Sequence, residues 1–283
     1  MVKPLKKIGV ILIIIILLPA VFFSVYEIGT LSSSEKVIEE IYNNQLDAIL
    51  YSVNQFSEDI AGSWINKINM NLALQKIRPE EFNKEILKLQ SENPIKMVFF
   101  LDDLKSSSPV IYTLADIKQP ETNVSVKADF TRQINSLVRQ NENRIRRLYT
   151  YKKGGYRKIE AIQSNILNNS IALIFLLDNE NNTQTICGLF IDPLSFVRKT
   201  LAPKLQEVSQ GKFIIMVSEG TNNRQIYATE NTGYLRINIK KQLWLFPSYN
   251  LSIALKGTTI QQLVKSRYYM SLGLIGLLNI VLI

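Results

Sequence analysis

The residues IALIFLLDNENNTQTICGLFI, from Ile171 to Ile191, decide the fold of the middle of this chain. Ile171–Leu177 is an apolar run of strand length, DNENN supplies turn-forming residues, and Thr183–Ile191 is a second apolar run. Two such runs separated by a polar turn predict a β-hairpin whose strands are both buried.

Further strands and helices are predicted on either side of this hairpin. An amphipathic helix is marked by apolar residues between Val126 and Leu148, and Asp192-Pro193 begins another helix that is kinked or broken at Pro203. Strands that are segregated from helices, with the helices on one face, indicate an α+β fold rather than a doubly wound parallel fold. The other predicted strands are Ile95–Leu101, Pro109–Leu114, Tyr156–Leu167, Lys212–Ser218, Arg224–Thr229, Tyr234–Ile239 and Leu243–Leu255.

A long helix is predicted ahead of the strands, from Leu31 to Leu74. It opens on the capping-box pattern Ser32-x-x-Glu35, and its apolar residues then recur at steps of three and four. We expect the later half to pack on its own domain and the earlier half to pair with a second copy, which makes the protein a homodimer. Glu80–Gln90 predicts a short second helix.

Both ends of the chain have the composition of membrane spans. Ile8–Tyr26 is a run of 19 uncharged residues, about 28 Å as a helix, and the lysines before it favour a cytoplasmic N-terminus. Tyr268–Ile283 is apolar over 16 residues, about 24 Å as a helix, and predicts a second span that is incomplete in this chain. A cleaved signal peptide and a buried C-terminal helix are the alternatives. Two spans place residues 29–267 outside the inner membrane.

The domain organisation that follows has six parts. They are a cytoplasmic N-terminus at 1–7, a transmembrane helix at 8–28, a long stalk helix and a short helix at 29–92, a membrane-distal domain at 93–191, a smaller membrane-proximal domain at 192–257, and a helix that leads into the second transmembrane span at 258–283.

Composition excludes several kinds of chemistry. The chain has no histidine and a single cysteine, Cys187, so histidine triads, histidine metal ligands and thiolate clusters cannot form within it. We therefore expect no catalytic residues, no metal and no cofactor in this segment. The net charge of +9 fits nucleic acid, a membrane surface or an anionic ligand, and the predicted placement outside the cytoplasm argues against nucleic acid.

Two segments resemble the Cache family, whose members are PAS-like extracytoplasmic domains. GLFIDPLSFV, from Gly188 to Val197, is similar to the end of a Cache sheet, where a G-x-x-x-D pattern leads into a helix. GKFIIMVSEGTNNRQIYATE, from Gly211 to Glu230, resembles the hairpin that opens the membrane-proximal half of double-Cache domains, and Trp244–Lys256 resembles the strand that closes it. With the flanking spans, the layout is similar to the input region of bacterial sensor histidine kinases, and a single Cache domain with an extension stays open.

The resemblance implies PAS-like antiparallel sheets, and a small ligand or periplasmic protein partner that binds the distal half. It also implies a signal that passes along the long first helix and the final helix to cytoplasmic modules. The kinase part is expected beyond residue 283. Chemoreceptors and nucleotide cyclases with the same front end are alternatives, as are a membrane-anchored enzyme that uses carboxylates and an envelope structural or assembly protein.

The candidate ligand residues lie in and after the basic run RQNENRIRRLYTYKKGGYRK, from Arg139 to Lys158. Arginine can hold a carboxylate with two hydrogen bonds, and the tyrosines of this run can line a pocket. The run resembles the arginine-then-aromatics stretch of amino-acid-binding double-Cache domains, which implies ligand contacts for Arg146 and Tyr149, with Asp178 as the acidic residue. Tyr151 is a further candidate ligand residue, as a tyrosine that can line the pocket. The family's tryptophan position holds Leu148, and a solvated basic helix end is the alternative interpretation.

Overall fold

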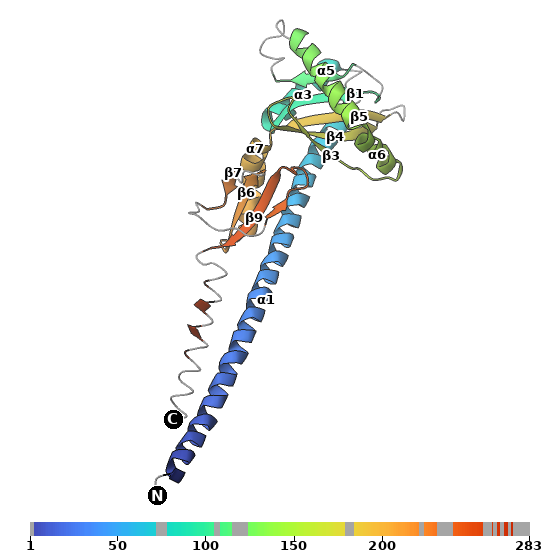
Figure 1. Cartoon of the computed structure of the whole chain (residues 1–283). Coiled ribbons are helices and arrows are strands. Elements are labelled where there is room, and N and C mark those ends of the chain that lie inside the picture. Colours follow the sequence, from blue (N-terminus) through green and yellow to red (C-terminus); the bar gives the residue numbers. More distant parts are fainter. Residues whose placement is uncertain are drawn as a thin grey trace. The chain divides into compact units, whose positions relative to one another are not determined.

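The computed structural model describes the backbone of residues 3–71, 78–104, 108–114, 124–178, 184–220, 224–230 and 240–256, together with residues 262, 265, 266, 269, 270 and 273 (Figure 1). Side chains are described for the same residues, except for most of 3–35 and residues 39, 124, 125 and 255. The predicted strand Tyr234–Ile239 lies outside the described residues.

The chain divides into two compact units. One consists of Met1–Ala48, Gly211–Ile214 and Ile253–Ile283, and the other of Ile49–Gln210 and Ile215–Ser252. The second unit holds nearly all of the strands and most of the shorter helices, so the fold and the candidate site are described within it.

Helix α1 runs from Lys3 to Asn71 as one continuous element of 69 residues, with Pro19 inside it. The expected helix start at Ser32 is therefore wrong, because the apolar run that precedes Ser32 is itself helical and Ser32 is an interior position. Within the described part of the chain, no helix combines the length and the hydropathy of a membrane span. Most side chains of Ile8–Tyr26 and of Tyr268–Ile283 lie outside the described set, and the two spans stay predictions.

The first sheet has five strands in the order β2-β1-β5-β4-β3, and each neighbouring pair is antiparallel. The predicted hairpin is confirmed, since β4 (Ser170–Asp178) pairs with β5 (Gln184–Ile191) from Ile171↔Ile191 to Asp178↔Gln184. The remaining strands are β1 (Ile95–Leu101), β2 (Val110–Thr113) and β3 (Glu160–Ser164).

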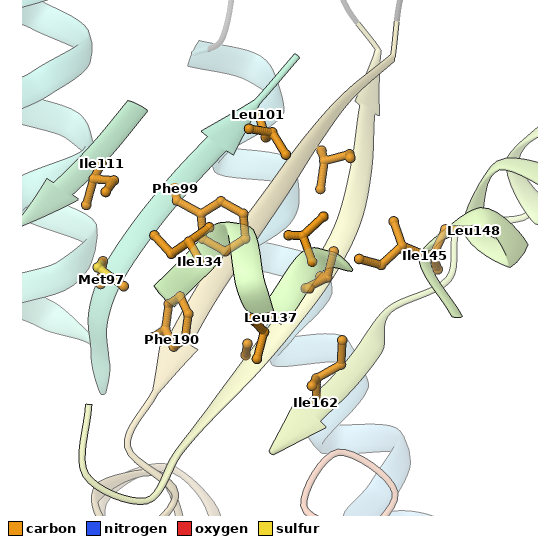
Figure 2. Packing of buried hydrophobic residues seen from close by; sticks show 14 of the residues in the cluster. Met97, Phe99, Leu101, Ile111, Ile134, Leu137, Ile145, Leu148, Ile162 and Phe190 are labelled. Atoms are coloured by element: carbon orange, nitrogen blue, oxygen red, sulfur yellow. The ribbon is translucent and has the colours of Figure 1, made fainter. Parts of the chain in front are cut away.

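One face of this sheet is covered by α5 (Val124–Gln140) and α6 (Glu142–Lys153), as Figure 2 shows. The predicted single helix is divided at Asn141, whose side-chain amide donates to the carbonyl of Leu137 at 2.9 Å. The core between these helices and the sheet consists of Met97, Phe99, Leu101, Ile111, Ile134, Leu137, Val138, Ile145, Leu148, Ile162, Ala172, Ile174, Leu176, Ile186 and Phe190.

The opposite face of the sheet is covered as well. The ring of Phe82, in α3 (Pro79–Glu92), lies 5.7 Å from the ring of Phe100 in β1, and both side chains are buried. The expectation of helices on one face is therefore wrong. The second face is covered because β1, β4 and β5 are apolar at successive positions, so both faces of these strands must be shielded from water.

A helical connection follows β5, as Asp192-Pro193 predicts. It consists of α7 (Pro193–Ser195), the π-helical η2 (Phe196–Leu201) and α8 (Ala202–Ser209). Pro203 stands in the first turn of α8, directly after the π-helical turn η2.

The second sheet has four strands in the order β7-β6-β9-β8. They are β6 (Phe213–Glu219), β7 (Arg224–Ala228), β8 (Lys240–Gln242) and β9 (Tyr249–Leu255). The predicted strand Leu243–Leu255 is shorter than expected, because a turn in which Tyr249 donates to the carbonyl of Phe246 precedes β9 and Pro247 has no N–H to pair. Helices and two antiparallel sheets confirm the α+β class.

Candidate functional site

The four candidate ligand residues do not form one recorded cluster. Arg146 is exposed on α6, and its Nε and Nη2 donate to Glu142 Oε1 at 2.8 and 2.5 Å. Asp178 stands at the end of β4, where its Oδ2 accepts from Lys152 Nζ at 2.6 Å. Arg146 and Asp178 are therefore each paired with a different side chain of the protein, Glu142 and Lys152.

The two tyrosines have different environments. Tyr149 is half-buried against the core under α6, and burial raises the pKa of its hydroxyl, with Asp103 adding to the rise and Arg146 opposing it. Tyr151 is 42% exposed on the outer side of α6. The Arg146 guanidinium is near enough to Tyr149 to affect the pKa of its hydroxyl, and the ligand roles of all four residues stay predictions.

A cavity of about 360 Å³ lies where α1, α6, the segment before β3, and β4 meet. Ligand pockets typically have volumes of about 300–1,000 Å³, so this one has room for a small molecule. None of Arg146, Tyr149, Tyr151 and Asp178 belongs to its described lining. The lining residues are Gln55, Glu58, Asp59, Gly62, Ile65, Asn66, Leu148, Lys152, Tyr156, Arg157, Lys158, Ile159, Phe175 and Leu176.

The α1 wall of the cavity is polar and includes a glycine. Gln55, Glu58, Asp59 and Gly62 follow one another at helical spacing, so they share one face of α1. Gln55 Nε2 donates to Asp59 Oδ1 at 2.9 Å, whereas the Glu58 carboxylate has no recorded partner among the described residues. A Cβ on Gly62 would meet no atom within 4 Å, which leaves open space against the helix backbone.

The opposite wall carries positive charge. Lys152 comes from α6, and Tyr156, Arg157 and Lys158 follow the turn after it. Arg157 Nη1 donates to Asn66 Oδ1 at 2.7 Å and so connects this turn to α1. Carboxylates on one wall and cations on the other suit a small polar ligand. Such a ligand can be a zwitterion, an anion or a cation.

The turn that presents this wall is the one that Gly154-Gly155 predicts. The N–H of Gly155 donates to the carbonyl of Lys152 at 3.0 Å, and the N–H of Tyr156 donates to the carbonyl of Tyr151 at 2.9 Å. Gly155 has a φ of +81°, in the left-handed region that glycine adopts without strain. These bonds end α6 and turn the chain back toward α1.

The ionisable groups that line this cavity are those of Glu58, Asp59, Lys152, Tyr156, Arg157 and Lys158. No group of three metal-ligating side chains is found among the described residues. Cys187 is fully buried in β5, and burial raises the pKa of its thiol well above the ordinary value, which disfavours the reactive thiolate. The arrangement is suited to binding.

Sequence reasoning missed the contribution of α1 to this cavity. The signal that would have found it is the polar repeat of Gln55, Glu58, Gly62 and Asn66 on the side of the helix away from its apolar stripe. A glycine inside a long helix lowers stability by about 0.5–1 kcal/mol relative to alanine. The presence of Gly62 in α1 therefore indicates a position where the absence of a side chain has a use.

Comparison with known proteins gives little further guidance. No protein-family model matches the sequence, and no curated protein matches it. Among solved structures, the sensory domain of the Campylobacter jejuni chemoreceptor Tlp3 (CcmL) aligns with 78% of this chain and 96% of its own, at 10% identity and a TM-score of 0.37. A score at this level does not establish a shared fold.

Proposed function

We propose that this chain is the extracytoplasmic sensing region of a bacterial membrane receptor, and that the receptor is a two-component histidine kinase. The observation that carries the proposal is the cavity of about 360 Å³, one wall of which belongs to α1. The same helix contains the predicted span Ile8–Tyr26. A ligand in the cavity therefore contacts the element that would carry its signal toward the membrane.

The coupling works through differential binding. A ligand held between α1 and the turn at Arg157 favours the arrangement in which both walls contact it. Coupling free energies of about 1–3 kcal/mol are typical of such switches, and they correspond to changes of about 5–150-fold in an equilibrium. We propose that the receptor acts as a homodimer and that its ligand is a small molecule, with a periplasmic protein as the alternative.

Ligand binding can be tested by thermal unfolding of the full chain in mild detergent against a library of small polar metabolites. A ligand of the cavity raises the melting temperature of the wild type, and the variant Gly62→Leu, which places a side chain in the cavity, loses this rise. Ser63→Leu adds the same bulk at the neighbouring exposed position, outside the described lining, and should keep it. If no metabolite stabilises the wild type, or if both variants respond as the wild type does, the cavity is not the sensing site.

The membrane placement needs a separate test. Gln140 is exposed at the end of α5, and the only native cysteine is buried. A Gln140→Cys variant in a Cys187→Ser background should react with a membrane-impermeant maleimide in cells with a permeabilised outer membrane, whereas Lys3→Cys should react only after lysis. Labelling of Gln140→Cys only after lysis would place the domain in the cytoplasm and remove the receptor proposal.

The output class is tested by the coding sequence that follows Ile283. A histidine-containing dimerisation helix and an ATP-binding domain support the kinase. A methyl-accepting coiled coil or a cyclase domain would replace it with a chemoreceptor or a cyclase.

A further inference from the structure

The positive charge of this protein is concentrated in one short segment. Residues 139–158 contain eight of the 33 basic side chains and one of the 24 acidic ones, so seven of the nine net positive charges lie in 20 residues. The rest of the chain is close to neutral. The segment covers the end of α5, all of α6 and the turn that follows (Figure 1).

Three of these eight cations pair with carboxylates of the protein. Arg144 Nε donates to Glu160 Oε1 at 2.5 Å, and Arg146 and Lys152 pair with Glu142 and Asp178. The remaining five have no recorded acidic partner among the described residues: Arg139, Arg147, Lys153, Arg157 and Lys158.

The C-terminal dipole of α6 accounts for one of these five, Lys153. Basic residues in the last turn of a helix are stabilised by its carbonyl end, and Lys152 and Lys153 occupy that turn. The effect falls off within one turn, so it does not reach Arg147, and Arg157 and Lys158 lie beyond the helix. Arg139 stands in the last turn of α5, and Arg157 bonds to the neutral side chain of Asn66. Arg147, Lys153, Arg157 and Lys158 have no acidic partner among the described residues, so their charge is available to an anionic partner.

Two tyrosines stand among these cations with their rings exposed. Tyr151 is 42% exposed and Tyr156 is 67% exposed. Ile145 and Leu148 turn the inner side of α6 toward the core (Figure 2). Arg147 and Tyr151 lie four residues apart on the outer side of the helix.

The backbone of Tyr156 is held by the turn, and its ring lies over Gly154. Its N–H donates to the carbonyl of Tyr151, and its Cδ2 would lie 3.3 Å from a Cβ placed on Gly154, so the ring covers this glycine. The two tyrosines therefore belong to one helix end and the turn that follows it.

We propose that Arg147, Tyr151, Lys153, Tyr156, Arg157 and Lys158, which we call the basic–aromatic surface, bind a linear anionic polysaccharide. Guanidinium groups bind carboxylate or phosphate groups with paired hydrogen bonds, and the C–H face of a sugar ring packs on an exposed aromatic ring. The choice of a polysaccharide over a nucleic acid rests on the proposed placement outside the cytoplasm. Tyr156, Arg157 and Lys158 also line the cavity, so the polymer lies at its mouth.

The experiment measures binding of the full chain to a fluorescent polygalacturonate oligosaccharide by anisotropy, with neutral dextran of equal length and single-stranded oligothymidylate as comparison probes. Polygalacturonate should bind, dextran should not, and added salt should weaken binding because counterions are released. The double variant Arg147→Gln/Lys153→Gln should weaken binding about tenfold or more, since it removes two charge-assisted contacts. Tyr151→Ser and Tyr156→Ser should each weaken it several-fold and leave its salt dependence unchanged.

The matched control is Lys84→Gln/Lys88→Gln, which removes the same charge from exposed positions of α3. It should bind as the wild type does, and the melting temperatures of all variants should be unchanged. Equal loss in this control means attraction by net charge alone. Tyrosine variants without effect, oligothymidylate binding as tight as polygalacturonate, or no polygalacturonate binding at low salt would each overturn the proposal. Gly62→Leu should leave polymer binding intact, so failure of the cavity hypothesis and failure of this one are distinguishable.

Discussion

Gly188 shows how one residue sets the packing of the central strand. It stands in β5 opposite Phe99 of β1 and Ile174 of β4. A Cβ at this position would lie 2.0 Å from Cε1 of Phe99, whose side chain is fully buried. The glycine is required by the close approach of this ring.

Replacing Gly188 by alanine should therefore destabilise the protein by at least about 1–3 kcal/mol, the usual cost of overpacking a core. Urea unfolding measures the change, and Phe99→Leu in the same chain should recover part of it. Gly62→Ala is the control, because a Cβ there meets no atom within 4 Å and should stabilise the helix by about 0.5–1 kcal/mol. If the losses of unfolding free energy for Gly188→Ala and Phe99→Leu are additive, the Phe99 ring is not the reason that position 188 requires glycine.

Tyr249 gives the protein a titration at alkaline pH. Burial raises the pKa of its hydroxyl from 10.0 to about 12, and the nearby charges of Glu219 and Asp192 add to the rise. The unfolded chain ionises first, so the stabilisation is complete below pH 10 and is lost as the pH rises from about 10 to 12.

We expect the wild type to lose about 2 kcal/mol more than Tyr249→Phe over this interval, since phenylalanine keeps the ring contact with Phe246 and cannot ionise. Urea unfolding of both proteins at pH 8, 10, 11 and 11.5 measures the difference. Parallel curves would show that the phenol is not held neutral by the fold.

At the scale of elements, the connection from β5 into the second sheet depends on one capping residue. Asp192 Oδ1 accepts from the N–H of Leu194 at 3.2 Å, and Ser195 Oγ donates to Asp192 Oδ2 at 2.9 Å. The cap starts α7 at the residue where the last strand of the first sheet ends, and so fixes the direction in which the chain leaves that sheet.

Asp192→Ala should cost about 1–2 kcal/mol, because the first N–H groups of the helix lose their acceptor. Asp192→Asn should cost less, since an amide oxygen still accepts from Leu194. Chemical denaturation of both variants tests the order, and equal losses would assign the effect to the charge, which lies 3.7 Å from Lys96 Nζ, and not to the cap.

At the scale of the whole molecule, residues far apart in sequence meet inside the second unit. The N–H of Trp244 donates to Asn54 Oδ1 of α1 at 2.9 Å across 190 positions. Phe196 of η2 lies 5.8 Å from Trp64 of α1 and 4.8 Å from Phe246, ring centre to ring centre. These contacts join α1 to the segment between β8 and β9.

Asn54→Ala should destabilise the protein by about 1–3 kcal/mol, because it leaves a partly buried backbone N–H without an acceptor. Hydrogen exchange measured at the Trp244 amide should accelerate more than exchange in the first sheet. An exchange rate at Trp244 equal to that of the wild type would show that Asn54 does not hold this segment.

Much of the fold was predictable because it is local. The hairpin Ile171–Ile191, the turn at Gly154-Gly155 and the helix start at Asp192-Pro193 depend on neighbours in the chain and are confirmed. The start of α1 was predicted wrongly. The capping pattern at Ser32 does not mark a helix start, because the helix already runs through this position from Lys3. The layer of helices on the second face was missed, although the unbroken apolar strands required it.

The sequence by itself determined the α+β class and the concentration of positive charge around α6, because both depend on residue order and composition. Only the tertiary structure decided that a cavity forms where α1 meets α6 and β4, that Lys152 and not Arg146 pairs with Asp178, and that Phe99 covers Gly188. The reason is that periodicity and turn chemistry are local properties. Which side chains share a cavity depends on contacts between segments tens of residues apart, and these form only when the core is packed.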